Sequence, residues 1–321
     1  MPANKDHFLP AAYLGRFSAA PQSRLRDSLL WVRRRNQPPF RQKAENLGYA
    51  RGLYNVGSAA PPLFGTVDTF LTGAEKTVHK AIEAARAQAS CGLNAGDYSL
   101  LVPFAASLFA RGRDFPLRYR HRLGDTIEIV DLDAYMNDTN MNLARLLELQ
   151  RLYYPVMAAR WKFLHAADRS IITNDIAMTA TFDPLTAEHG YVIALDPTVA
   201  LLITKTNRKP RVFWTGNEWV VPDVEHHQLG ARAVAGLNQS LARASVGGFY
   251  GPTREAVQTA ISDEALGPPR GHGPEPHYLV TDGRWIRDHE LDFYSFISLI
   301  ARPPANPAFA RWERVPTSTG A

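Results

Sequence analysis

Hydrophobic positions in the middle of the chain recur at helical spacing. Apolar residues of 66–89 fall three or four positions apart, which predicts an amphipathic helix. Residues 95–115 show the same spacing and predict a second helix, bent at Pro103 because proline cannot donate the backbone hydrogen bond. The pattern from 139 to 167 predicts a third helix. The middle of the chain is therefore expected to be mainly helical.

Short runs rich in β-branched residues lie on either side of this region and predict strands. They are residues 28–35, 169–175, 190–196, 199–204, 211–222 and 246–251. A further helix is predicted at 224–243 and a short one from Thr253. Strands bracket the helices instead of alternating with them, which favours an α+β fold. We expect a helical middle packed on a mixed or antiparallel sheet, in a single domain.

The two ends of the chain differ in character. Residues 6–17, DHFLPAAYLGRF, are apolar for a terminus, and we expect Phe8, Leu9, Leu14 and Phe17 to anchor them in the core. The main domain is predicted to cover residues 5–265. Residues 266–321, rich in proline, are expected to form a linker and a C-terminal extension packed on the same domain.

Composition and charge narrow the class of protein. Cys91 is the single cysteine, which excludes an internal disulfide, and no apolar run is long enough to cross a membrane. We expect a cytoplasmic protein. The net charge is +5, with arginines clustered at 24–43 and 111–122. Clustered guanidinium groups suit phosphate and indicate a polyanionic partner, although charges paired across an ordinary solvated surface explain each cluster as well.

Familiar catalytic motifs do not occur in the sequence. The chain has no glycine loop for phosphates and no nucleophile elbow. Residues 223–227, DVEHH, combine carboxylates with two imidazoles, but neighbours on a helix point about 100° apart and cannot chelate together. We therefore expect neither a metal nor a cofactor.

Four polar residues stand in apolar settings and are candidate catalytic groups: His7, Glu75, Asp175 and Asn238. His7 precedes a short predicted helix, and Glu75 lies near the apolar stripe of the 66–89 helix. Asp175 follows Asn174 at the end of a predicted strand, and Asn238 interrupts an apolar helix face. The alternative is that each is a hydrogen-bonded core residue, a surface acid or a turn former.

The same positions carry a resemblance to a known family. The opening H-x-x-P-x-x-Y-L-x-x-F, formed by His7, Pro10, Tyr13, Leu14 and Phe17, resembles the first signature of the microbial domain-of-unknown-function family number 4238. Later blocks in the same order are similar to that family, and together they cover most of residues 5–260. They are LLWVRRR, ENLGYARGLYNV, VDTFLTGAEKTVHKAI, FAASLFARGRDF, SIITNDIAM, IALDPTVALLI and LNQSLARASVGGFYG. The sequence departs from the pattern at Thr173 and Asn174, and at Asp196, where the family has serine.

The fungal branch of this family includes arginine-containing cyclodipeptide synthases, which use aminoacyl-tRNA. The resemblance implies a peptide-bond-forming enzyme of the aminoacyltransferase type, in which His7, Glu75, Asp175 and Asn238 serve catalysis. Substrate or RNA would be bound by Tyr13, Arg33, Arg34, Arg35, Arg111, Arg113 and Asn174. The ester is already activated, so no ATP is required.

Two other classes remain open from the sequence. A metal-dependent nuclease or phosphodiesterase of phage defence would use Glu75 and Asp175 as metal ligands. A non-catalytic RNA-binding module would need only the basic surface. Convergence of the candidate residues on one cleft would favour an enzyme.

Overall fold

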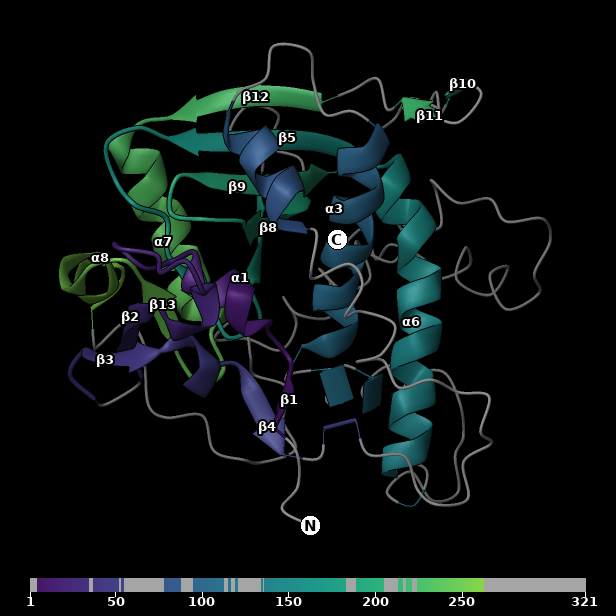
Figure 1. The fold of residues 1–321 in the computed structure, drawn as a ribbon, viewed down its shortest axis with the longest axis horizontal. Helices are drawn as coiled ribbons and strands as arrows, with labels where there is room; N and C mark the ends of the chain where they lie inside the picture. The colour runs from purple at the N-terminus through teal and green to yellow at the C-terminus, as the bar shows by residue number, and fades with distance from the viewer. Residues whose placement is uncertain are drawn as a thin grey trace, which may run out of the picture.

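Two larger β-sheets and a pair of long helices are the main elements of the computed structural model (Figure 1). The structure describes residues 5–34, 37–51, 53–54, 78–87, 95–112, 115–116, 119–120, 134, 136–182, 189–204, 213–215, 218–220 and 224–262.

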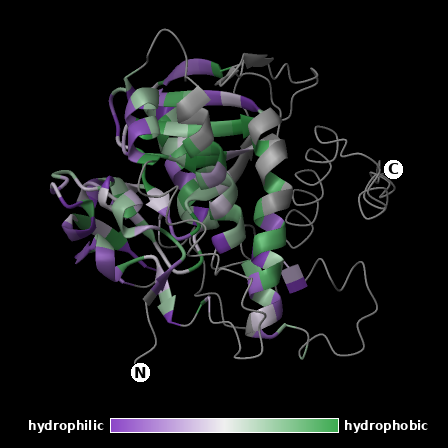
Figure 2. Ribbon diagram, turned by 45° about the vertical axis from the view of Figure 1, so that its right-hand side comes forward, coloured by the Kyte–Doolittle hydropathy of each residue, from purple (hydrophilic) through white to green (hydrophobic). Residues whose placement is uncertain are grey.

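The larger sheet has five strands. Its order is β12 (Val224–Leu229), β5 (Arg160–Ala166), β9 (Val199–Thr204), β8 (His189–Ala194) and β7 (Met178–Phe182). All neighbours are antiparallel except β12 and β5, which are parallel. Every residue of β9 and the middle five of β5 are buried, so these strands are central to the core. Figure 2 shows the concentration of hydrophobic residues in this sheet.

The smaller sheet is antiparallel and joins segments from both ends of the described chain. Its order is β3 (Phe40–Lys43), β2 (Leu29–Arg33), β13 (Phe249–Gly251) and β6 (Thr173–Asn174). A turn leads from β6 directly into β7 of the larger sheet. Ala177 in this turn has a φ of 60°, a left-handed conformation that costs a residue with a Cβ about 1–2 kcal/mol. The turn therefore holds the two sheets together at the expense of local strain.

Two short antiparallel pairs lie outside these sheets. The strand β1 (Lys5–His7) pairs with β4 (Tyr49–Arg51), and β10 (Phe213–Thr215) pairs with β11 (Glu218–Val220). The pairing of β1 with β4 fixes the first described residues on the body of the protein.

The helices cover the sheets. The long helices α3 (Ala95–Arg111) and α6 (Asp138–Ala158) lie side by side (Figure 1). The helix α7 (Ala231–Ala244) packs on β6 and β7. The short α8 (Arg254–Thr259) lies against β2 and β13, and α1 (Ala11–Gly15) follows β1. Residues 78–86 are also helical. Two 3-10 turns, η1 (Leu25–Asp27) and η2 (Ala44–Asn46), contact α1.

The α+β prediction is confirmed, and so is the expected anchoring of the N-terminal segment. Phe8, Leu9, Leu14 and Phe17 all belong to the main hydrophobic core. The strand predicted at 199–204, the helix with Pro103 inside it and the short helix after Thr253 are present as well.

Two segments predicted as helix are strands instead. Residues 160–166 form β5, and residues 224–229 form β12, which pairs with β5 along its length. β12 pairs with β5, about 60 positions away, and β5 also pairs with β9 on its other side. These long-range hydrogen bonds override the local periodicity.

The structure tests one further prediction in part and another not at all. No helix in the described ranges is long and apolar enough to cross a membrane. The extension predicted at 266–321 lies outside the described residues.

Candidate functional site

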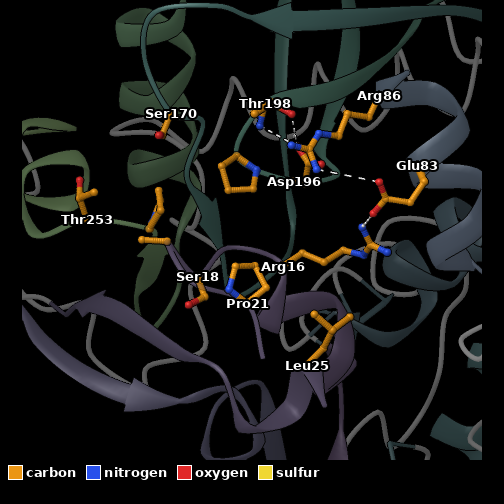
Figure 3. A pocket seen from close by; sticks show the side chains of 13 residues that line it. Arg16, Ser18, Pro21, Leu25, Glu83, Arg86, Ser170, Asp196, Thr198 and Thr253 are labelled. Atoms are coloured by element: carbon orange, nitrogen blue, oxygen red, sulfur yellow. Dashed lines mark hydrogen bonds and ion pairs between the residues drawn. The ribbon is translucent and has the colours of Figure 1, made fainter. Parts of the chain in front are cut away.

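A pocket of about 520 Å³ opens where the two sheets meet α1 and the helix at 78–86 (Figure 3). Its charged lining residues are Arg16, Glu83, Arg86 and Asp196. Hydroxyl groups come from Ser18, Ser170, Thr198 and Thr253, which belong to segments leading into or out of the strands. The pocket thus combines both signs of charge with neutral donors.

Asp196 is the buried acid of this pocket, with only 3% of its surface exposed. Its Oδ1 accepts three hydrogen bonds, from the Thr198 amide at 2.6 Å, the Thr198 hydroxyl at 2.7 Å and the Val199 amide at 3.0 Å. Within the described part of the chain, Oδ2 accepts none. One oxygen therefore fixes the turn after β8, and the other is available to a ligand in the pocket.

Two arginines form the opposite charge of the pocket. The Nη1 of Arg16 donates to Oε1 of Glu83 at 2.8 Å, and its Nη2 donates to the His79 carbonyl at 3.2 Å. Nη1 of Arg86 lies 3.9 Å from the second oxygen of Glu83. The Arg16 side chain is only 9% exposed, whereas Glu83 is 54% exposed. Arg16 is therefore a fixed cation, and its counter-ion stands at the solvent edge.

Tyr13 positions Arg16 through α1. The Tyr13 hydroxyl donates to the Ala194 carbonyl at 2.5 Å. It lies 2.9 Å from Oγ1 of Thr173, which must be the donor because the tyrosine proton is already used. Burial, partly opposed by the Thr173 contact, raises the pKa of Tyr13 well above its ordinary range. Tyr13 therefore stays neutral and ties α1 to both sheets.

Asn174, Asp175 and Asn238 come together around the segment that joins the sheets. Nδ2 of Asn174 donates to the carbonyls of Met178 at 3.0 Å and Leu241 at 2.7 Å. The two carboxylate oxygens of Asp175 accept the amides of residues 246 and 247. All three candidate side chains are buried.

Asn238 clamps the start of the same segment. Its Oδ1 accepts the Ile172 amide at 3.0 Å, and its Nδ2 donates to the Ser170 carbonyl at 2.9 Å. Ser170 lines the pocket, so Asn238 supports one wall of the pocket from outside it.

His7 and Arg111 form a separate group. The His7 carbonyl accepts hydrogen bonds from Nη2 of Arg111 at 2.7 Å and from the Tyr54 hydroxyl at 3.1 Å. Nε of Arg111 also contacts the Tyr54 hydroxyl, at 3.1 Å. Neither His7 nor Arg111 lines the pocket. The structure therefore divides the candidates between two networks.

The remaining candidates differ in exposure. Arg33 is buried, and its Nη1 donates to the carbonyls of residues 257, 258 and 261 at the end of α8. Arg34 is exposed, with its guanidinium 5.6 Å from the centre of the Phe40 ring. Glu75, Arg35 and Arg113 lie outside the described residues.

Sequence reasoning did not select Arg16, Ser170 or Asp196 as site residues. Arg16 stands three positions after Tyr13, a helical spacing that would have brought it near the segments that Tyr13 contacts. Asp196 differed from the family pattern, and that departure was a signal. Nothing in the sequence pointed to Ser170.

Among the described residues, no group of three or more His, Cys, Asp and Glu side chains is arranged to bind a metal. Comparisons of the chain with protein-family models, with curated proteins and with solved structures find no match.

Proposed function

We propose that this protein is an aminoacyl-tRNA-dependent peptide-bond-forming enzyme, similar to an arginine-containing cyclodipeptide synthase, with its substrate site in the pocket at Asp196. The observation that supports it is the open Oδ2 of this buried carboxylate, in the same pocket as Arg16 and Arg86. An aminoacyl ester of tRNA has an ammonium group on the amino acid and phosphates on the nucleotides. The charges of the pocket are complementary to such a ligand.

The reaction joins two aminoacyl groups. The neutral amine of one attacks the ester carbonyl of the other, so a C–N bond forms, the C–O bond to the first ribose breaks and a dipeptidyl ester remains. The free amine of this dipeptide then attacks the remaining ester carbonyl, which forms the second C–N bond, breaks the C–O bond to the second ribose and releases the cyclic dipeptide. In each step the attacking amine must lose a proton, and the ribose oxygen must gain one. Asp196 Oδ2 is the base in this proposal and passes the proton to the departing oxygen. The Ser170 hydroxyl, which has no hydrogen-bond partner among the described residues, is the donor to the developing oxyanion.

Three candidates have supporting roles in this proposal. Tyr13 and Asn238 act as positioning residues, because they hold α1 and the Ser170 segment against the pocket. Asp175 fixes the backbone between α7 and β13. The resemblance drawn from the sequence of residues 5–260 is what suggests this activity, and the pocket adds charges that suit such a substrate.

The test is a reaction of the purified protein with tRNA charged with labelled arginine. We expect release of an arginine dipeptide. Asp196→Asn keeps the Oδ1 acceptor but removes the base, and should lower the rate by about 10²–10⁴-fold. Asp168→Asn, at an exposed turn position, is the matched control and should leave the rate unchanged. Loss of labelled ester without a dipeptide, or no turnover at all, would refute the proposal, and metal-dependent cleavage of the RNA would favour a nuclease.

A further inference from the structure

Two histidines from different strands meet at the edge of the larger sheet. Nε2 of His165, on β5, lies 2.9 Å from Nδ1 of His226, on β12. Their ring centres are 5.1 Å apart and the planes differ by 19°. One nitrogen donates its proton to the lone pair of the other. The two nitrogens therefore face each other across a single shared proton.

The backbone holds both rings in place. β12 and β5 are paired in parallel over six residues, with His226 opposite Phe163 and Gln228 opposite His165. His165 is buried, and the His226 ring also stacks on Phe163 with the centres 5.3 Å apart. The residue His226 itself is exposed. The buried ring of His165 is thus held rigidly, and the ring of His226 beside it can be reached from solvent.

The charged residues of β12 lie on its other face, because successive side chains of a strand alternate. There Glu225 accepts hydrogen bonds from Arg160 and, at 3.0 Å, from Nε2 of His227. The Nζ of Lys162 is 3.8 Å from Glu225. The Glu225 carboxylate partly neutralises Arg160 and Lys162. These two side chains therefore repel a metal ion at the histidine pair less than unpaired cations would.

We infer that His165 and His226 form a binding site for a divalent transition metal of the Zn²⁺ class, in which the ion replaces the shared proton. Zinc–nitrogen bonds of about 2.1 Å at a tetrahedral angle separate the two nitrogens by about 3.4 Å. Tilting the rings opens the present separation by about half an ångström, which the exposed ring on the edge strand can accommodate. Water completes the coordination from the open side.

The shared proton does not have to leave the protein when a metal binds. A neutral imidazole has one N–H, so when the ion takes the place between Nε2 of His165 and Nδ1 of His226, the proton moves to the outer nitrogen of the ring that held it. No residue of the pair takes part in the proposed peptide-bond chemistry, although Asp196 is close enough to His165 to interact with it electrostatically.

The test is calorimetric titration of the untagged protein with Zn²⁺. His226→Phe keeps the stack on Phe163 and removes the ligand nitrogen, and it should weaken Zn²⁺ binding at this site by about tenfold or more, because a chelate turns into a single contact. His227→Phe alters the neighbouring residue on the opposite face and should leave the affinity unchanged. Mg²⁺, which prefers oxygen ligands, should not compete.

A second measurement covers variants that fold poorly. Zn²⁺ should raise the thermal unfolding temperature of the native protein and of His227→Phe, and at the same zinc concentration should raise that of His226→Phe by clearly less. Zinc stoichiometry and affinity that are unchanged in His226→Phe would overturn the inference, whether or not the protein makes a dipeptide.

Discussion

Replacement of Tyr13 by phenylalanine tests the junction on which the pocket depends. The ring is 2% exposed, so the substitution keeps its packing and removes only the hydroxyl. Two hydrogen bonds disappear, one donated to the Ala194 carbonyl and one accepted from Thr173. A buried polar group without a partner costs about 1–3 kcal/mol, and the Thr173 hydroxyl recovers part of its loss by rotating. We expect Tyr13→Phe to lower the free energy of unfolding by about 2–3 kcal/mol.

The assay is urea denaturation followed by tryptophan fluorescence, with Tyr13→Phe, Thr173→Val and the double variant measured together. A lower midpoint at an unchanged slope reports a change in stability. In the double variant, the Thr173 substitution should cost about 1 kcal/mol less than it does alone, because its partner is already absent. A loss below about 0.5 kcal/mol in Tyr13→Phe, or strict additivity of the two substitutions, would refute the reasoning.

The pH dependence gives the same residue a second test. The unfolded tyrosine ionises near pH 10, but burial keeps the folded one protonated, because its pKa is raised. Above pH 10 the folded state therefore binds more protons than the unfolded state, and stability falls as pH rises. The difference in stability between the native protein and Tyr13→Phe should shrink there by up to about 1.4 kcal/mol per pH unit.

Three further substitutions probe other contacts. Asn238→Leu leaves the Ile172 amide and the Ser170 carbonyl without their bonds and should cost about 2–4 kcal/mol in urea denaturation, whereas a neutral result would contradict the clamp. Arg33→Met removes the donor to two carbonyls of α8 and to the Ile261 carbonyl beyond it, so amide exchange in residues 254–261 should accelerate. Because the pKa of His226 is lowered in the folded protein, the unfolded state binds more protons below about pH 6.5, and stability decreases as the pH is lowered. His226→Phe should reduce this decrease, measured as the unfolding temperature between about pH 5 and 7. An unchanged dependence of the unfolding temperature on pH would show that His226 is not its cause.

Local patterns predicted the elements whose own residues carry a clear periodicity or a continuous apolar run. The helix that contains Pro103 keeps its apolar spacing, and the strand at 199–204 is a continuous apolar run buried on both faces. β5 and β12 were missed because both depend on pairing with strands far away in the sequence, β12 with β5 and β5 with β9 and β12. The run of histidines at 226–227 illustrates the consequence. On a strand the two side chains face opposite ways, and His226 finds its partner in His165, which no local spacing could indicate.

The candidate site was predictable only as a set of unusual residues. Asn174, Asp175 and Asn238 were singled out because polar groups in apolar surroundings need partners, and the structure provides those partners from the backbone. A sequence does not distinguish an asparagine that binds a substrate from one that binds a main-chain amide. The pocket residues Arg16 and Asp196 lie 180 positions apart, and only the packing of α1 against the end of β8 brings them to one cavity.

The position of α1 explains why the N-terminal segment is apolar. Phe8, Leu14 and Phe17 bury the segment, and the Tyr13 hydroxyl then reaches the end of β8 and, through Thr173, the strand β6. These two strands belong to different sheets, so α1 bridges them at the place where the pocket opens. Arg16 follows directly at the end of α1. The same packing that stabilises the N-terminal segment therefore also fixes the charge of the pocket, and a substitution that loosens α1 should weaken ligand binding together with stability.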